Sequence, residues 1–158
     1  MMRKLILLFL VVGMFSCGED ENQRETVYTM YQVGWRPTTG SVVITDLGNG
    51  KIEVNVKLQS IQEGQYQAHL HFGSINELGE LAYRLTDLDG QTGKSRTILD
   101  NVELSDGSLL TYDMLLQMDG SVKIHDKDPL IKNTVVAFGN IGENDNFATG
   151  GITVCIGH

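Results

Sequence analysis

The chain has 158 residues, and its 20 acidic and 12 basic side chains give a formal net charge of −8 at pH 7 with neutral histidines. A chain of this length fits one domain with its own hydrophobic core. The acidic balance argues against nucleic-acid binding, because phosphate recognition requires a basic patch and the sequence contains none.

The first 16 residues read as a secretory signal peptide. Arg3 and Lys4 form a basic head, and residues 5–14 form an apolar run that is too short to span a bilayer as a mature helix. Removal of residues 1–16 takes two basic and no acidic side chains. The remaining 142 residues then carry ten basic and 20 acidic side chains, a formal net charge of −10.

The end of this segment resembles the lipobox of bacterial lipoproteins, since the small residue Ser16 directly precedes Cys17. The resemblance implies that Cys17 is diacylated, becomes the new N-terminus and attaches the protein to a membrane. Residues 18–21 (Gly-Glu-Asp-Glu) are similar to the acidic tract of Bacteroidetes-type lipoproteins that face outward from the outer membrane. The implied location is the cell envelope, as a surface-exposed outer-membrane lipoprotein. The alternative is a plain signal peptide and a soluble periplasmic protein.

The rest of the chain divides into a polar tether at residues 17–26 and one domain at residues 27–158. If Cys17 is acylated, Cys155 has no intramolecular partner, so we expect no internal disulfide. Cys155 lies in the apolar stretch 152–156 and is expected to be a buried strand thiol.

The domain is expected to be all-β, because 18 glycines against two prolines separate short apolar segments without a 3.6-residue repeat. A tight turn is expected at residues 47–50, where Gly and Asn tolerate positive φ. This number of short strands in one domain predicts an antiparallel β-sandwich or flattened barrel. The expected strands cover residues 41–45, 51–58, 66–72, 82–85, 96–99, 109–116, 121–125, 134–138 and 152–156.

Two histidines fall on one face of the predicted strand 66–72. Alternate apolar residues from Tyr66 to Phe72 point to the core, which places His69 and His71 together on the opposite face. Residues i and i+2 of a strand lie about 6.5 to 7 Å apart, and two imidazoles can converge from there on one ion at about 2 Å per bond.

A third histidine has the same orientation in a later strand. Val122 and Ile124 point inward in residues 121–125, so His125 points outward. If the fold places this strand beside residues 66–72, His69, His71 and His125 share one surface and form a candidate metal site. The open alternative is that all three are ordinary solvent-facing polar residues.

Residues 68–73 (Ala-His-Leu-His-Phe-Gly) resemble the His-x-His strand of copper/zinc superoxide dismutases and the core motif of chordin-type (CHRD) domains. Residues 120–130 are similar to the dismutase stretch in which a glycine opens a strand that ends in a copper-binding histidine. Residues 136–142 resemble the family's Ala-Cys-Gly-x-Ile-Gly segment, with Phe138 in place of the cysteine. The resemblance covers residues 41–142 and implies a superoxide dismutase-like Greek-key β-sandwich.

The resemblance implies that His69, His71 and His125 match three copper ligands. Residues 74–119 contain no histidine, although the family carries its bridging histidine and zinc ligands in this span. No arginine follows Gly142, and a net charge of −10 would repel superoxide. A zinc site and efficient dismutation are therefore not expected, and no catalytic residue is assigned.

Three functions follow from the sequence. The first in rank is a non-catalytic, lipid-anchored, CHRD-like module that binds a protein or glycan partner. The second is a copper-binding protein that uses His69, His71 and His125. The third is a copper-dependent redox enzyme of degenerate dismutase type. Copper uptake separates the first from the other two, and turnover separates the second from the third.

Overall fold

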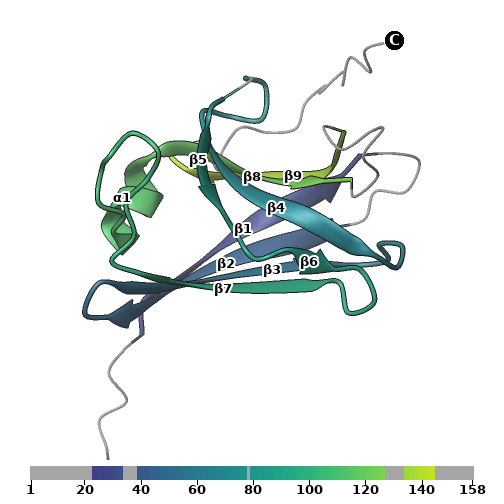
Figure 1. Ribbon diagram of the computed structural model, residues 1–158, viewed down its shortest axis with the longest axis horizontal. Helices are drawn as coiled ribbons and strands as arrows, with labels where there is room; N and C mark the ends of the chain where they lie inside the picture. The colour runs from purple at the N-terminus through teal and green to yellow at the C-terminus, as the bar shows by residue number, and fades with distance from the viewer. Residues whose placement is uncertain (1–22, 34–38, 78, 127–133, 145–158) are drawn as a thin grey trace, which may run out of the picture.

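The computed structural model describes residues 23–33, 39–77, 79–126 and 134–144. These residues form nine β-strands in one sheet and one short α-helix (Figure 1). Within them, no helix has the length and apolar character needed to cross a membrane. The predictions for Cys17, Cys155, the signal peptide and the strand 152–156 lie outside the described residues.

The elements follow one another along the chain with short connections. They are β1 (Glu25–Gln32), β2 (Thr39–Gly48), β3 (Lys51–Leu58), β4 (Gln65–Phe72), β5 (Leu81–Arg84), β6 (Leu88–Asp89), β7 (Lys94–Asp100), α1 (Tyr112–Gln117), β8 (Asp119–His125) and β9 (Val135–Gly142).

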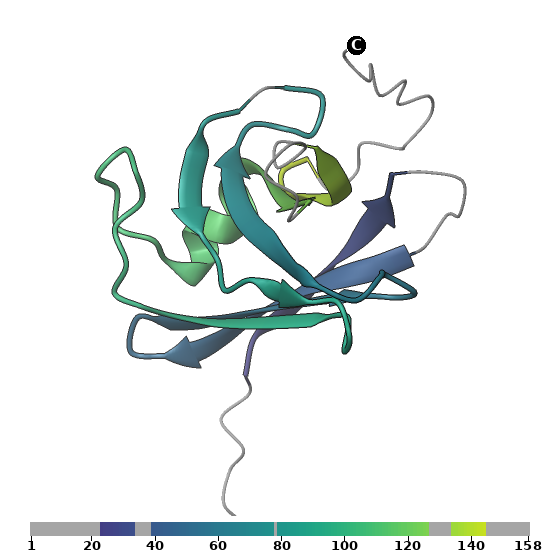
Figure 2. The same ribbon diagram turned by 45° about the vertical axis from the view of Figure 1, so that its right-hand side comes forward.

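The sheet closes on itself. Its strand order is β1, β2, β3, β7, β6, β4, β8 and β9, and β9 pairs again with β1. Strand β5 pairs with the second half of β4, whereas β6 pairs with the beginning of β4. All of these pairings are antiparallel. Strand β3 pairs with β7 rather than with its successor β4, and β4 pairs with β8, which is Greek-key connectivity. Figures 1 and 2 show β4 lying across the direction of β1–β3, and with the closed strand order the predicted all-β flattened barrel is confirmed.

Side-chain alternation explains the strands that were predicted. In β3 every second residue is buried and the others face outward. The turn that precedes β3 has positive φ at Gly48, Asn49 and Gly50, as the sequence predicted for residues 47–50. The buried residues of β3 are Ile52, Val54, Val56 and Leu58.

The prediction of a strand at residues 109–116 was wrong, because helix α1 begins there at Tyr112. Thr111 caps the helix, since its side chain accepts a hydrogen bond from the backbone N–H of Met114 at 3.1 Å. Asp113 lies in the first turn, where a negative charge is favourable. Tyr112 and Leu115, spaced three apart, are buried in the core, so the apolar residues follow a helical rather than a strand period.

The sheet also begins earlier than the expected domain start at residue 27, since β1 begins at Glu25. Arg24 contributes to this early start. Its guanidinium pairs with Asp46 at 2.6 Å and with Asp113 at 2.7 Å, and it lies 4.7 Å from the centre of the Tyr112 ring. These contacts tie the beginning of β1 to β2 and α1.

The N-cap of α1 can be tested by substitution. Thr111→Ala removes the acceptor for the Met114 N–H, and it should lower the free energy of unfolding by about 1 kcal/mol in a urea titration. Thr111→Ser keeps the acceptor and should unfold with nearly wild-type stability. Equal stability of the alanine variant and the wild type would contradict the capping role.

Candidate metal site

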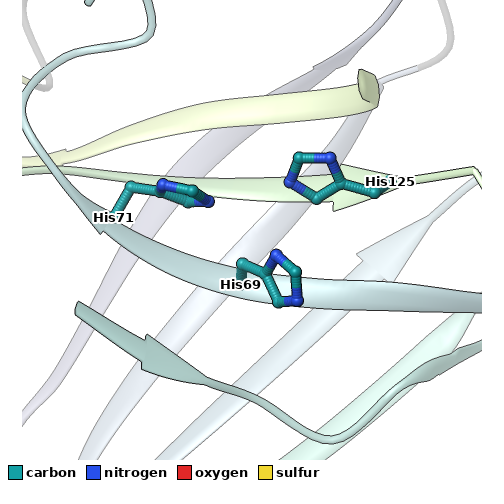
Figure 3. A group of neighbouring side chains, drawn as sticks. All are labelled: His69, His71 and His125. Atoms are coloured by element: carbon teal, nitrogen blue, oxygen red, sulfur yellow. The ribbon is translucent and has the colours of Figure 1, made fainter. Parts of the chain in front are cut away.

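Three histidines on two neighbouring strands form the candidate site. His69 and His71 lie on β4 and His125 lies on β8, strands far apart in the sequence that pair along six positions. The register places Lys123 opposite His69 and Ser121 opposite His71. Because side chains alternate across a strand, the three imidazoles point to the same outer face of the barrel (Figure 3). The structure therefore brings together the three residues that the sequence singled out.

The imidazoles are close enough to share one ion. The ring centres of His69 and His125 are 4.8 Å apart, and that of His71 lies 5.8 Å from each of the other two. One nitrogen of each ring lies within 4.8 Å of its counterparts. Three nitrogens that bind one ion at about 2.1 Å lie about 3.4 to 3.6 Å apart, so the rings must move closer by about 1 Å for coordination. Among the described residues, this is the one cluster of three or more metal-binding side chains, and it contains neither carboxylate nor thiolate.

A backbone carbonyl fixes the tautomer of His71. Its Nδ1 lies 2.8 Å from the carbonyl oxygen of Gly79, and because a carbonyl only accepts, Nδ1 carries the proton. The lone pair then lies on Nε2, which is buried and has no hydrogen-bond partner among the described residues. A metal ion would satisfy this buried lone pair, and a carbonyl bonded to the other nitrogen is a common support for a metal-binding histidine.

The connection from β4 to β5 covers this face of the barrel; we refer to its described residues, 73–77 and 79–80, as the covering segment. The N–H of Gly73 donates to the backbone carbonyl of Asp119 at 2.8 Å, and the N–H of Ile75 donates to the side-chain oxygen of Asn140 at 2.9 Å. A Cβ atom at Gly79 would lie 1.5 Å from the carbonyl oxygen of Phe72, so this position requires glycine. The covering segment is thereby fixed to β8 and β9.

The alternative in which the three histidines are ordinary solvent-facing residues does not describe the centre of this face. Ser121 is 0% exposed and Lys123 is 6% exposed, while the three histidines are half-buried. The physical reason is the covering segment, which strand alternation alone does not predict. The site therefore lies outside the hydrophobic core but is largely shielded from water.

Burial sets the charge of the histidines. Desolvation lowers the pKa of His69, and the nearby charges of His71 and Arg84 lower it further. Desolvation also lowers the pKa of His71 and outweighs the hydrogen bond to Gly79, which raises it. Both rings are therefore neutral at pH 7, which is the form that binds metal ions.

Lys123 is a further member of the site that the sequence reasoning did not identify. It lies two residues before His125 on the same face of β8, opposite His69. Its ammonium group donates to the carbonyl oxygen of Glu77 at 3.2 Å, and burial lowers its pKa. Strand alternation around His125 was a signal that could have placed Lys123 on this face. Nothing in the local pattern identifies Gly79, since its contact with His71 depends on how the covering segment folds.

No model of a known protein family matches the chain, and no match to a curated protein is found. The description of the site therefore stands on the geometry of this chain.

The pKa shifts predict how the stability of the metal-free protein changes with pH. As the pH falls below about 6.5, the imidazoles of the unfolded chain bind protons that His69 and His71 in the folded chain resist. The free energy of unfolding should therefore decrease between pH 6.5 and 5, above the range in which the shifted carboxylates titrate. The measurement is urea unfolding at several pH values in the presence of a chelator.

The control is the double variant His69→Gln, His71→Gln, which lacks both titrating groups. Its free energy of unfolding should depend less on pH in this window. Identical slopes for the variant and the wild type would show that other groups cause the loss of stability.

Proposed function

We propose that this protein is a copper-binding protein of the cell envelope, with His69, His71 and His125 as the metal ligands. The observation that carries the proposal is the approach of three imidazole nitrogens to within 4.8 Å of one another. Any metal-binding function requires that His125 lie close to His69 and His71, and these distances meet that requirement. This support moves copper binding ahead of the partner-binding module that the sequence alone ranked first.

The donor set favours copper. Imidazole suits the later divalent ions, and the Irving–Williams order places Cu(II) above the other divalent ions of the first row. Hard ions such as calcium prefer oxygen ligands, which the cluster does not offer. Resemblance of residues 68–73 and 120–130 to the copper-binding strands of copper/zinc superoxide dismutases also supports this choice.

The chain's own residues define the role. His71 would bind through Nε2 while its Nδ1 stays on the Gly79 carbonyl, and the covering segment limits access of water. Copper at this site would supply one-electron exchange, and His69, His71 and His125 would leave a position open for exchange with another carrier. We propose storage, delivery or sensing of copper, without catalysis. Efficient dismutation is not part of the proposal, because the net charge of the mature chain repels superoxide.

We also propose that Cys17 is lipidated and anchors the protein to the outer membrane, facing outward. The support is the sequence of residues 1–21, with its basic head, short apolar run, Ser-Cys junction and acidic tract. A partner-binding role of the barrel, as in CHRD-like modules, is compatible with this location.

Copper titration tests the metal site. The purified mature chain should bind one copper ion with sub-micromolar affinity, and His69→Ala and His125→Ala should each weaken binding at least about 100-fold by removing one of three ligands. Isothermal calorimetry or chelator competition measures both. Gln67→Ala is the matched control, because it lies on the same face of β4 and offers no imidazole. Equal copper binding by the histidine variants and the wild type would contradict the assignment.

The anchor is tested separately. In a bacterial host with lipoprotein processing, the wild-type protein should incorporate a labelled fatty acid and fractionate with membranes. Cys17→Ser should lose both properties, while Cys155→Ser should keep them. A labelled Cys17→Ser protein would exclude this residue as the acylation site.

A further inference from the structure

We propose that Lys123 shifts the preference of the three-histidine site toward singly charged copper, Cu(I), and away from the doubly charged ions Cu(II) and Zn(II), which the imidazoles by themselves favour. This inference rests on the proposed function and specifies which oxidation state of copper the site prefers. It starts from the position of one buried cationic side chain beside three neutral ligands.

The geometry places Lys123 next to the candidate ligands. It is directly opposite His69 in the β4–β8 register and two residues from His125 on the same face. Its ammonium group donates a hydrogen bond to the backbone carbonyl of Glu77, and His71 donates one to the backbone carbonyl of Gly79. Both side chains are therefore held by the covering segment. Lys123 is only 6% exposed, so water cannot fully hydrate its ammonium group.

Within the described part of the chain, few negative charges offset the charge of Lys123. No described carboxylate lies within ion-pair distance of its ammonium group, and its hydrogen-bond acceptor is the neutral carbonyl of Glu77. The carboxylate of Glu77 acts on it only through longer-range attraction. On the other side of His69, Arg84 adds a second positive charge, which is exposed and partly balanced by Asp87 at 3.4 Å.

A positive charge near the site disfavours a bound ion in proportion to the charge of that ion. Cu(II) and Zn(II) therefore incur twice the repulsion that Cu(I) incurs from Lys123. An imidazole binds a metal ion in its neutral form, so none of the three ligands offsets the second positive charge. Partial burial raises the cost of the higher charge again, because desolvation penalises a doubly charged ion more than a singly charged one.

Coordination number favours the same ion. Cu(II) prefers a tetragonal arrangement, for which three imidazoles supply too few ligands. Cu(I) has a filled d shell and therefore no such geometric requirement. The described cluster offers three ligand atoms. Zinc separates the two causes, because it carries the same charge as Cu(II) without the tetragonal preference.

The test compares Lys123→Met, which keeps an unbranched apolar stem, with the wild type. Anaerobic competition against a Cu(I)-specific chelator and aerobic competition for Cu(II) and Zn(II) give the three affinities. Lys123→Met should raise the affinities for Cu(II) and Zn(II) about tenfold more than the affinity for Cu(I). The reduction potential of the bound copper should then fall by about 59 mV for each tenfold change in the Cu(I)/Cu(II) affinity ratio.

Three further variants keep the test decisive. Lys123→Arg retains the positive charge and should keep the wild-type selectivity. Lys123→Gln is neutral and can still donate to Glu77, so it should reproduce the change in selectivity if Lys123→Met does not fold. Lys57→Met removes an exposed lysine of β3 and should change none of the affinities.

The outcomes separate this inference from the proposed function. Absence of copper binding in the wild type would overturn the proposed function. Copper binding with the same Cu(I)/Cu(II) and Cu(I)/Zn(II) ratios in the wild type and the neutral Lys123 variants would overturn the selectivity alone. A change for Cu(II) without a change for Zn(II) would also overturn it, because the cause would then be geometry and not charge.

Discussion

The antiparallel pairing of β4 with β8 is the interaction on which the rest of this structure depends. It closes the sheet into a barrel and joins strands that the chain separates by β5, β6, β7 and α1. The inner face of the pair contributes Ala68, Leu70 and Ile124 to the core, while the outer face brings the three histidines together. One register therefore fixes both the hydrophobic packing and the candidate site, because a shift by one residue would exchange the two faces.

The covering segment turns an exposed group of histidines into a shielded one. It hydrogen-bonds to β8 and β9, supplies the carbonyl that orients His71, and accepts the bond from the buried Lys123. Shielding lowers the pKa of His69 and His71, which keeps both rings neutral at pH 7, and it strengthens the electrostatic effect of any charge nearby. The chemistry that we propose therefore depends on this connection as much as on the ligands.

Strand periodicity predicted much of the fold and the direction of each histidine. The alternation of β3, the glycine turn before it and the outward positions of His69, His71 and His125 could all be read locally. The prediction failed for residues 109–116, because the buried residues Tyr112 and Leu115 follow the spacing of a short helix that Thr111 caps. Burial of Lys123 and the contact of Gly79 with His71 depend on a connection that returns over the sheet, and such long-range packing leaves no periodic signal.

The position of the ligands has a consequence for unfolding. An ion held by His69 and His125 would connect the two strands at the seam where the barrel closes. Separation of β4 from β8 would then require loss of the ion, so the occupied protein should resist unfolding by the free energy of binding. Metal affinity and closure of the barrel are thus properties of the same strand pair, and the concentration of free metal would set how strongly the domain resists unfolding.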